Sequence, residues 1–199
     1  MTVLYLVRHA KPAATWGEAT DSKLDDPGLD ELGRAQAQTT ADTLRKLLPA
    51  LPVYTSPLQR CRETAAPLAS HWRCEPIVSP QVAEIPSPPL KAQAKRIWLT
   101  KGMEGTWPQL QTDSPMGSPD YLAWRMSLLD SLFELTTDSV IFSHFIAINV
   151  AVGAAQGHDR VISFRPGHAS VTEIEIFGKH IAIRKLGAEL NGNDILLGK

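Results

Sequence analysis

The sequence predicts an α/β fold, a three-layer α/β/α sandwich in which helices cover both faces of a mainly parallel sheet. Two uninterrupted apolar runs, residues 3–7 and 139–143, are typical of strands that are buried on both faces. Strand-like and helix-like segments alternate between these runs, which favours parallel pairing through helical crossovers. Near the end of the chain, Gly178 and Lys179 form a tight turn between two further strand-like runs, so we also expect one antiparallel partner.

The chain between the apolar runs divides at its prolines and glycines. Residues 11–28 are rich in Pro, Gly, Asp, Thr and Ser and predict a long loop beside the first strand. Apolar residues at helical spacing then predict a helix over 29–48, which Pro49 stops. The elements expected after it are a strand over 51–56, a helix over about 58–70, a short strand over 75–78, a helix over 118–135, a helix over 146–155, and strands over 170–177 and 180–186.

Residues 79–119 hold seven prolines and are the least regular part of the sequence, with a short helix expected around 90–99. This stretch is too short and too rich in proline to bury a core of its own. We therefore expect a single domain over residues 1–199, with an excursion over the active site at about 79–119. The Ser118-Pro119-Asp120 sequence predicts the start of the helix that follows, with the Ser118 hydroxyl as its N-cap.

Composition excludes several classes of protein. Twenty basic and twenty-one acidic residues leave a net charge of −1, which gives no sign of a nucleic-acid or membrane partner. No run approaches the roughly 20 apolar residues of a membrane span, and the N-terminus does not read as a signal peptide. Cys61 and Cys74 lack metal-ligand spacing, so we expect buried or half-buried thiols in a reducing, cytoplasmic compartment.

Four residues occupy equivalent positions at the ends of predicted elements. Arg8 and His9 end the first strand, Arg60 opens the helix after the second, and His144 ends the later buried strand. An isolated Arg-His pair is more often an exposed strand end, but parallel strands would bring all four residues to one edge of the sheet. Two guanidinium groups and two imidazoles around one point suit an oxyanion with several charges, because one guanidinium can donate two parallel hydrogen bonds to two phosphate oxygens.

These residues also carry a resemblance. The sequence resembles the histidine phosphatase superfamily, whose fold is phosphoglycerate mutase-like, from residue 3 to about residue 177. The motifs that match are Leu6-Val7-Arg8-His9-Ala10, Asp26-Pro27-Gly28-Leu29 with Gly33 and Gln36-Ala37, Ser56-Pro57-Leu58-Gln59-Arg60 with Thr64-Ala65, and Phe142-Ser143-His144. In combination these motifs are highly specific.

The resemblance implies a role for each matching residue. His9 would be the nucleophile that becomes phosphohistidine, and Arg8, Arg60 and His144 would bind the phosphate oxygens, with no metal and no cofactor. Glu84 stands where the family places its general acid, and the alternative interpretation is a solvated loop carboxylate. Many relatives continue with a Gly-Trp-Glu-Gly type segment, whereas residues 85–89 here read Ile-Pro-Ser-Pro-Pro.

The function that follows is a phosphomonoester phosphatase that acts through a phosphohistidine intermediate on a small phosphorylated substrate, with a phosphoprotein also possible. Two alternatives stay open: a phosphoglycerate-type phosphomutase, and a phosphate-binding module of the same fold without turnover. The chain lacks the longer insertions associated with those mutases, which favours hydrolysis. The sequence predicts neither the substrate nor the oligomeric state.

A few further residues have less definite interpretations. Lys11 would either contact phosphate or face water, and His168 lies on a loop that precedes a strand, where a structural or exposed role is favoured. The remaining histidines show no partner pattern and are expected at the surface. Four aromatic residues are expected in the core rather than in a pocket: Trp98, Trp107, Tyr121 and Trp124.

Overall fold

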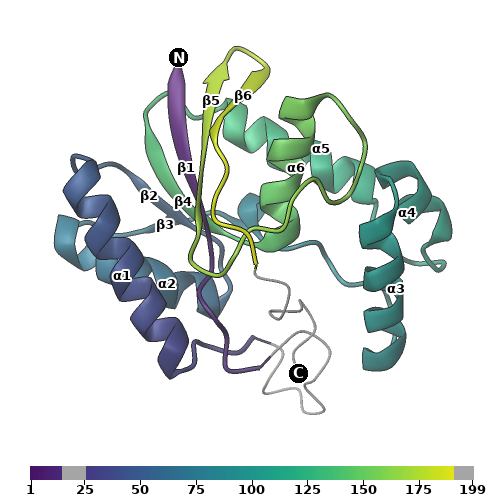
Figure 1. Cartoon of the computed structure of the whole chain (residues 1–199). Coiled ribbons are helices and arrows are strands. Elements are labelled where there is room, and N and C mark those ends of the chain that lie inside the picture. The colour runs from purple at the N-terminus through teal and green to yellow at the C-terminus, as the bar shows by residue number, and fades with distance from the viewer. Residues whose placement is uncertain (15–25, 191–199) are drawn as a thin grey trace.

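The strands form one six-stranded sheet in the order β3-β2-β4-β1-β5-β6 in the computed structural model, which describes residues 1–14 and 26–190 (Figure 1). The β1-β4, β2-β4 and β2-β3 pairs are parallel, and β5 runs antiparallel to both β1 and β6. The predicted mainly parallel sheet with one antiparallel partner is therefore confirmed. The strands are β1 (Thr2–Arg8), β2 (Val53–Thr55), β3 (Ile77–Val78), β4 (Ser139–Ser143), β5 (Val171–Phe177) and β6 (His180–Lys185).

Helices cover both faces of this sheet and give the three layers that the sequence predicts (Figure 1). Helices α1 and α2 lie on one face, and α5 and α6 lie on the other. No helix in the described part of the chain combines the length and apolar character needed to cross a membrane. The helices are α1 (Glu31–Leu47), α2 (Gln59–Trp72), α3 (Ala92–Glu104), α4 (Trp107–Asp113), α5 (Tyr121–Phe133) and α6 (Phe145–Gln156), with a short 3-10 helix at Pro80–Val82.

Strand β1 lies between the two cores and contributes to both. Its alternation places Val7 in the core under α1 and α2, with Phe142 of β4 beside it. Leu4 and Leu6 point to the opposite face and join the larger core under α5 and α6. These apolar side chains are almost fully buried, and burial of each contributes about 1.5–3 kcal/mol to folding. The central position fixes the carboxyl end of β1, where Arg8 and His9 stand.

Residues 79–119 are more regular than the sequence predicts: the short helix expected around 90–99 is α3, which extends to Glu104, and α4 is an additional helix. Helices α3 and α4 occupy about half of this segment, and Trp98, Trp107 and Leu110 join the larger core. Proline is tolerated in the first turn of a helix, where Pro108 stands, and Thr106 caps the same helix. The four aromatic residues expected in the core do pack there, although Trp124 is only partly buried. That the segment lies over the active site stays a prediction.

The start of α5 also differs from the prediction. The helix begins at Tyr121, and its N-cap is Asp120, whose carboxylate accepts a hydrogen bond from the Ala123 N–H at 2.8 Å. Ser118 instead belongs to a preceding turn, in which its N–H donates to the Pro115 carbonyl. Much of the loop predicted over residues 11–28 and the end of the chain after residue 190 lie outside the described residues.

Candidate active site

Parallel pairing of β1 with β4 brings two histidines to the same edge of the sheet. Arg8 is in register with Ser143, and the His9 N–H donates to the Ser143 carbonyl at 2.9 Å. His144 follows directly as the N-cap residue of α6. The His9 and His144 ring centroids are 5.2 Å apart, so the two strand ends present their imidazoles to one point.

The proton on His9 is placed by the neighbouring backbone. Its Nδ1 lies 2.8 Å from the Ala10 carbonyl oxygen, which only accepts, so Nδ1 carries the hydrogen and Nε2 keeps a lone pair. Burial is the main cause that holds the pKa of His9 well below 6.5, and His144, Arg60 and Arg8 add to it. The imidazole is therefore neutral at neutral pH, as a nitrogen nucleophile must be.

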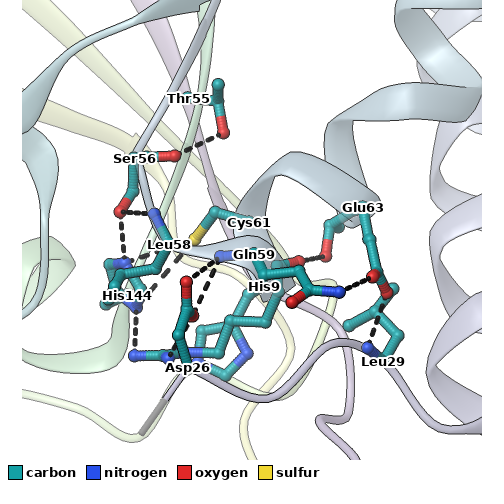
Figure 2. Close-up of polar contacts among 12 residues, drawn as sticks. His9, Asp26, Leu29, Thr55, Ser56, Leu58, Gln59, Cys61, Glu63 and His144 are labelled. Carbon is teal, nitrogen blue, oxygen red and sulfur yellow. Dashed lines mark hydrogen bonds and ion pairs between the residues drawn. The ribbon is translucent and has the colours of Figure 1, made fainter. Parts of the chain in front are cut away.

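Arg60 lies in the first turn of α2, as predicted, and points toward the histidines. Its NH2 group donates to Nδ1 of His144 at 3.2 Å, and its NH1 group lies 3.6 Å from Asp26. Asp26 also accepts from the Gln59 N–H with both oxygens, at 2.8 and 2.9 Å, and so caps the start of α2 (Figure 2). One carboxylate thus holds both the helix start and the arginine on it.

His144 is fully buried in a polar cage (Figure 2). Because Arg60 donates to Nδ1, the proton of the neutral ring is on Nε2, which donates to the Ser56 hydroxyl at 2.7 Å. Burial, with Arg60 and Arg8, holds the pKa of His144 well below 6.5. The thiol of Cys61 lies 3.3 Å from the same ring and 3.3 Å from the Ser143 carbonyl. Sequence reasoning gave no role to Ser56 or Cys61, although Ser56 begins the motif that contains Arg60.

Arg8, which directly precedes His9, completes the group. Its NH1 donates to the Pro166 carbonyl at 2.8 Å, its NH2 lies 3.0 Å from Nε2 of His168, and its guanidinium lies over the Phe145 ring. Sequence reasoning favoured a structural or exposed role for His168. The structure instead places this half-buried ring beside Arg8, with its centroid 5.8 Å from that of His9.

Lys11 does not join this group in the structure. Its amine pairs with Asp30 at 3.0 Å, and about half of its side-chain surface, 48%, is exposed. Of the two predicted possibilities, the side chain therefore faces water and a carboxylate.

Glu84 reaches the same edge of the sheet from the segment after the 3-10 helix. One carboxylate oxygen accepts from the Ile85 N–H at 3.0 Å and the other from the Ile146 N–H at 3.3 Å, in the first turn of α6. The Ser143 hydroxyl donates to the Val82 carbonyl and ties this segment to β4. Burial raises the pKa of the Glu84 carboxyl, and the two N–H groups and the arginine charges only partly oppose that rise.

The described residues offer no alternative centre for metal chemistry. Within residues 1–14 and 26–190, no group of three or more His, Cys, Asp or Glu side chains is arranged to hold a metal ion. What the geometry provides is a cationic pocket around a neutral imidazole nitrogen, with a carboxyl group at the same edge. Such a site can stabilise a phosphoryl group and accept it on nitrogen.

The family of this chain is shown by its similarity to known proteins. A family model described as the histidine phosphatase superfamily, branch 1, matches residues 4–189. The chain belongs to this superfamily. The predicted resemblance is thus confirmed, and the match spans both strands that carry the histidines.

Solved structures with the same fold include several phosphatases. A mycobacterial glucosyl-3-phosphoglycerate phosphatase in complex with vanadate has a TM-score of 0.74 at 20% identity, over 95% of this chain and all of that one. Bacillus stearothermophilus YhfR has a TM-score of 0.75 at 19% identity, over 96% and 98% of the two chains. An Entamoeba histolytica phosphoserine phosphatase in complex with 3-phosphoglyceric acid has a TM-score of 0.72 at 19% identity, over 94% and 98%. At these identities the likeness shows the phosphoglycerate mutase-like fold.

One curated relative has higher identity over a shorter stretch. The PE-PGRS family protein PE_PGRS11 of Mycobacterium tuberculosis is 36% identical over 83 residues, which are 42% of this chain and 14% of that protein. The matched stretch is thus a small part of a much longer polypeptide.

Proposed function

We propose that this histidine phosphatase family member is a phosphomonoester phosphatase that works through a phosphohistidine on His9. The observation that carries the proposal is the position of the hydrogen on the neutral His9 ring. The Ala10 carbonyl fixes the hydrogen on Nδ1, and burial beside Arg8 and Arg60 keeps Nε2 unprotonated in a cationic pocket. A nitrogen lone pair surrounded by phosphate-binding groups is what phosphoryl transfer to histidine requires.

The first half-reaction transfers the phosphoryl group to the enzyme. Nε2 of His9 attacks phosphorus, the bond between phosphorus and the ester oxygen breaks, and Glu84 gives its proton to the departing oxygen. Arg8 and Arg60 donate hydrogen bonds to the equatorial oxygens, whose negative charge grows in the transition state. His144 binds one of these oxygens once its hydrogen stands on Nδ1, the nitrogen that accepts from Arg60 in the structure. The raised pKa of Glu84 supports its role, because a carboxyl group donates only while it is protonated.

The second half-reaction releases phosphate. A water molecule gives a proton to the Glu84 carboxylate as its oxygen attacks phosphorus, and the bond between phosphorus and Nε2 breaks. Inorganic phosphate leaves, His9 is again neutral, and Glu84 is again protonated. The residues of this chain donate or accept every proton that moves in the cycle, and we propose that neither metal nor cofactor takes part.

The substrate is a small phosphorylated molecule in this proposal. Two relatives of the same fold support that class, because one is a glucosyl-3-phosphoglycerate phosphatase and the other, a phosphoserine phosphatase, holds 3-phosphoglyceric acid. A phosphoprotein remains the alternative substrate, and the cytoplasm is the compartment that we propose.

Rapid-quench labelling with a ³²P-labelled monoester tests this function. We expect an acid-labile, base-stable phosphoryl label on the native chain, no label on His9→Ala, and stoichiometric release of free phosphate. Transfer of the label to an isomerised sugar acid would identify a mutase instead. Tight binding of phosphate with no label on any of a panel of monoesters would identify a binding module without turnover.

A further inference from the structure

A single turn, residues 166–170, contacts Arg8 at four points. The Pro166 carbonyl accepts from NH1 at 2.8 Å, and Nε2 of His168 lies 3.0 Å from NH2. On the backbone, the Arg8 N–H donates to the Ser170 carbonyl and the Ala169 N–H donates to the Arg8 carbonyl, both at 3.1 Å. The turn therefore holds the side chain and the main chain of the same residue.

The turn is held in place from both sides. The Ser170 N–H closes it onto the Gly167 carbonyl at 3.2 Å, and the Gly167 N–H donates to the Ala188 carbonyl at 2.7 Å. Ala169 adopts a left-handed backbone conformation, with φ of 56°, and its side chain is buried against Ala10. This conformation costs a non-glycine residue about 1–2 kcal/mol, so the surrounding contacts must enforce it.

The contact between Arg8 and His168 fixes the state of the imidazole. A guanidinium donates and never accepts, so Nε2 of His168 must accept and the ring must be neutral with its hydrogen on Nδ1. The charged groups that face this ring are Arg8, Lys11 and Asp30. Burial and the two cations lower the pKa of His168 to about 3, which outweighs the opposite effect of Asp30.

The acceptor beside Arg8 is a neutral ring nitrogen, whereas a carboxylate at the same place would add a negative charge. Asp26 lies beside Arg60 and cancels part of the positive charge that would attract phosphate. An imidazole that accepts from Arg8 orients the guanidinium and adds no negative charge of its own beside it. The Phe145 ring, over which Arg8 lies, likewise adds no countercharge.

We propose that His168 is a positioning residue for Arg8, a neutral hydrogen-bond acceptor that orients the guanidinium toward the phosphoryl group without neutralising it. The inference rests on the proposed function, because it assigns Arg8 to phosphate binding. It extends that function to the 166–170 turn, which acts as a rigid holder for the arginine.

The test measures inorganic phosphate binding by calorimetry, alongside kcat and KM for a monoester. His168→Leu removes the acceptor and is expected to weaken phosphate binding about tenfold, the usual effect of losing one hydrogen bond to a charged group. His168→Gln keeps an acceptor oxygen at a similar reach and should stay within about threefold of the native protein. His168→Asp restores an acceptor but adds a negative charge, so it should bind phosphate more weakly than His168→Gln. His180→Leu, at an exposed position on β6, is the matched control and should bind phosphate normally.

A double-mutant cycle separates positioning from general stability. In an Arg8→Lys background the fork that His168 orients is gone, so His168→Leu should weaken phosphate binding less than about twofold further. Equal tenfold losses in both backgrounds, or a His168→Gln protein as weak as His168→Leu, would overturn the proposal. Because phosphate binding is measured without turnover, a native chain that hydrolyses no monoester would remove the proposed phosphatase function and still leave the role of His168 decided.

Discussion

Replacement of Glu84 by glutamine isolates the proton that we assign to the leaving group. In the structure both carboxylate oxygens accept backbone N–H groups, from Ile85 at 3.0 Å and from Ile146 at 3.3 Å. The side-chain amide of the Glu84→Gln variant keeps one acceptor oxygen and turns an NH2 group toward the other N–H. Loss of that one hydrogen bond should cost the fold about 1 kcal/mol, which leaves the variant folded.

The cost to catalysis should be larger and should depend on the leaving group. General acid catalysis is worth about 10²–10⁴-fold, or about 2.7–5.5 kcal/mol of activation free energy. We expect a loss of that size in kcat for alkyl phosphates, whose departing oxygen needs the proton. Aryl phosphates with good leaving groups should slow less than about tenfold, whereas His9→Ala should abolish turnover of both.

The pH profile gives a second measure of the same proton. Because burial raises the pKa of Glu84, native activity on alkyl phosphates should extend upward in pH and fall once the carboxyl ionises. Glu84→Gln should lose this alkaline fall. Glu75→Gln, an exposed carboxylate on the same segment, is the matched control and should behave as native. Equal slowing of alkyl and aryl phosphates by Glu84→Gln, or an unchanged alkaline fall, would refute Glu84 as the acid.

Three further predictions concern the close packing at Gly33, the reactivity of the two cysteines and the acid stability that depends on His168. A Cβ at Gly33 would overlap the Lys11 carbonyl oxygen, so Gly33→Ala should lower the free energy of unfolding by about 1–3 kcal/mol in chemical denaturation and reduce phosphatase activity. Burial raises the pKa of the Cys61 thiol, so iodoacetamide should label the half-buried Cys74 in the native protein and leave Cys61 unlabelled, as mass spectrometry would show. His168 has a folded pKa of about 3 and is protonated first in the unfolded chain, so acidification below pH 6.5 should destabilise the native protein. In denaturation series at pH 7 and pH 5, His168→Gln should remove about 2 kcal/mol of the stability that the native protein loses between these two pH values.

The convergence of Arg8, His9, Arg60 and His144 at one edge of the sheet could be predicted from sequence, because the signal for each element is local. The apolar run that ends at Arg8 and the one that ends at Ser143 each indicate a buried strand, and parallel strands bring their carboxyl ends together. The position of Arg60 follows from one more local signal, because Pro57 ends the preceding strand and a helix starts directly after it. The structure places all three elements as those signals indicate.

The contact of His168 with Arg8 could not be predicted, because it depends on how the strands pair rather than on sequence spacing. His168 reaches Arg8 because β5 pairs antiparallel with β1 on the side opposite β4, and because Ala169 adopts a left-handed turn conformation. Nothing in an Ala-Ser sequence indicates that conformation, which favours glycine. The end of α3 and the whole of α4 were missed for a different reason: the prolines were counted as helix breakers, although Pro108 stands at a position where a helix accepts it.

The pKa shifts of His9 and Glu84 both favour the protonation states that the proposed hydrolysis requires. Phosphoryl transfer needs the histidine unprotonated and the carboxyl group protonated at the same moment, yet at their ordinary pKa values of 6.5 and 4.5 the proton would prefer the histidine. Burial moves both groups toward the neutral form, and the two arginines further oppose a proton on His9. The arginine charges oppose a proton on Glu84 as well, but only in part, and a bound phosphate dianion would offset them. In the proposed mechanism, the same cations that bind the substrate therefore keep the nucleophile unprotonated, and substrate binding itself favours the protonated acid.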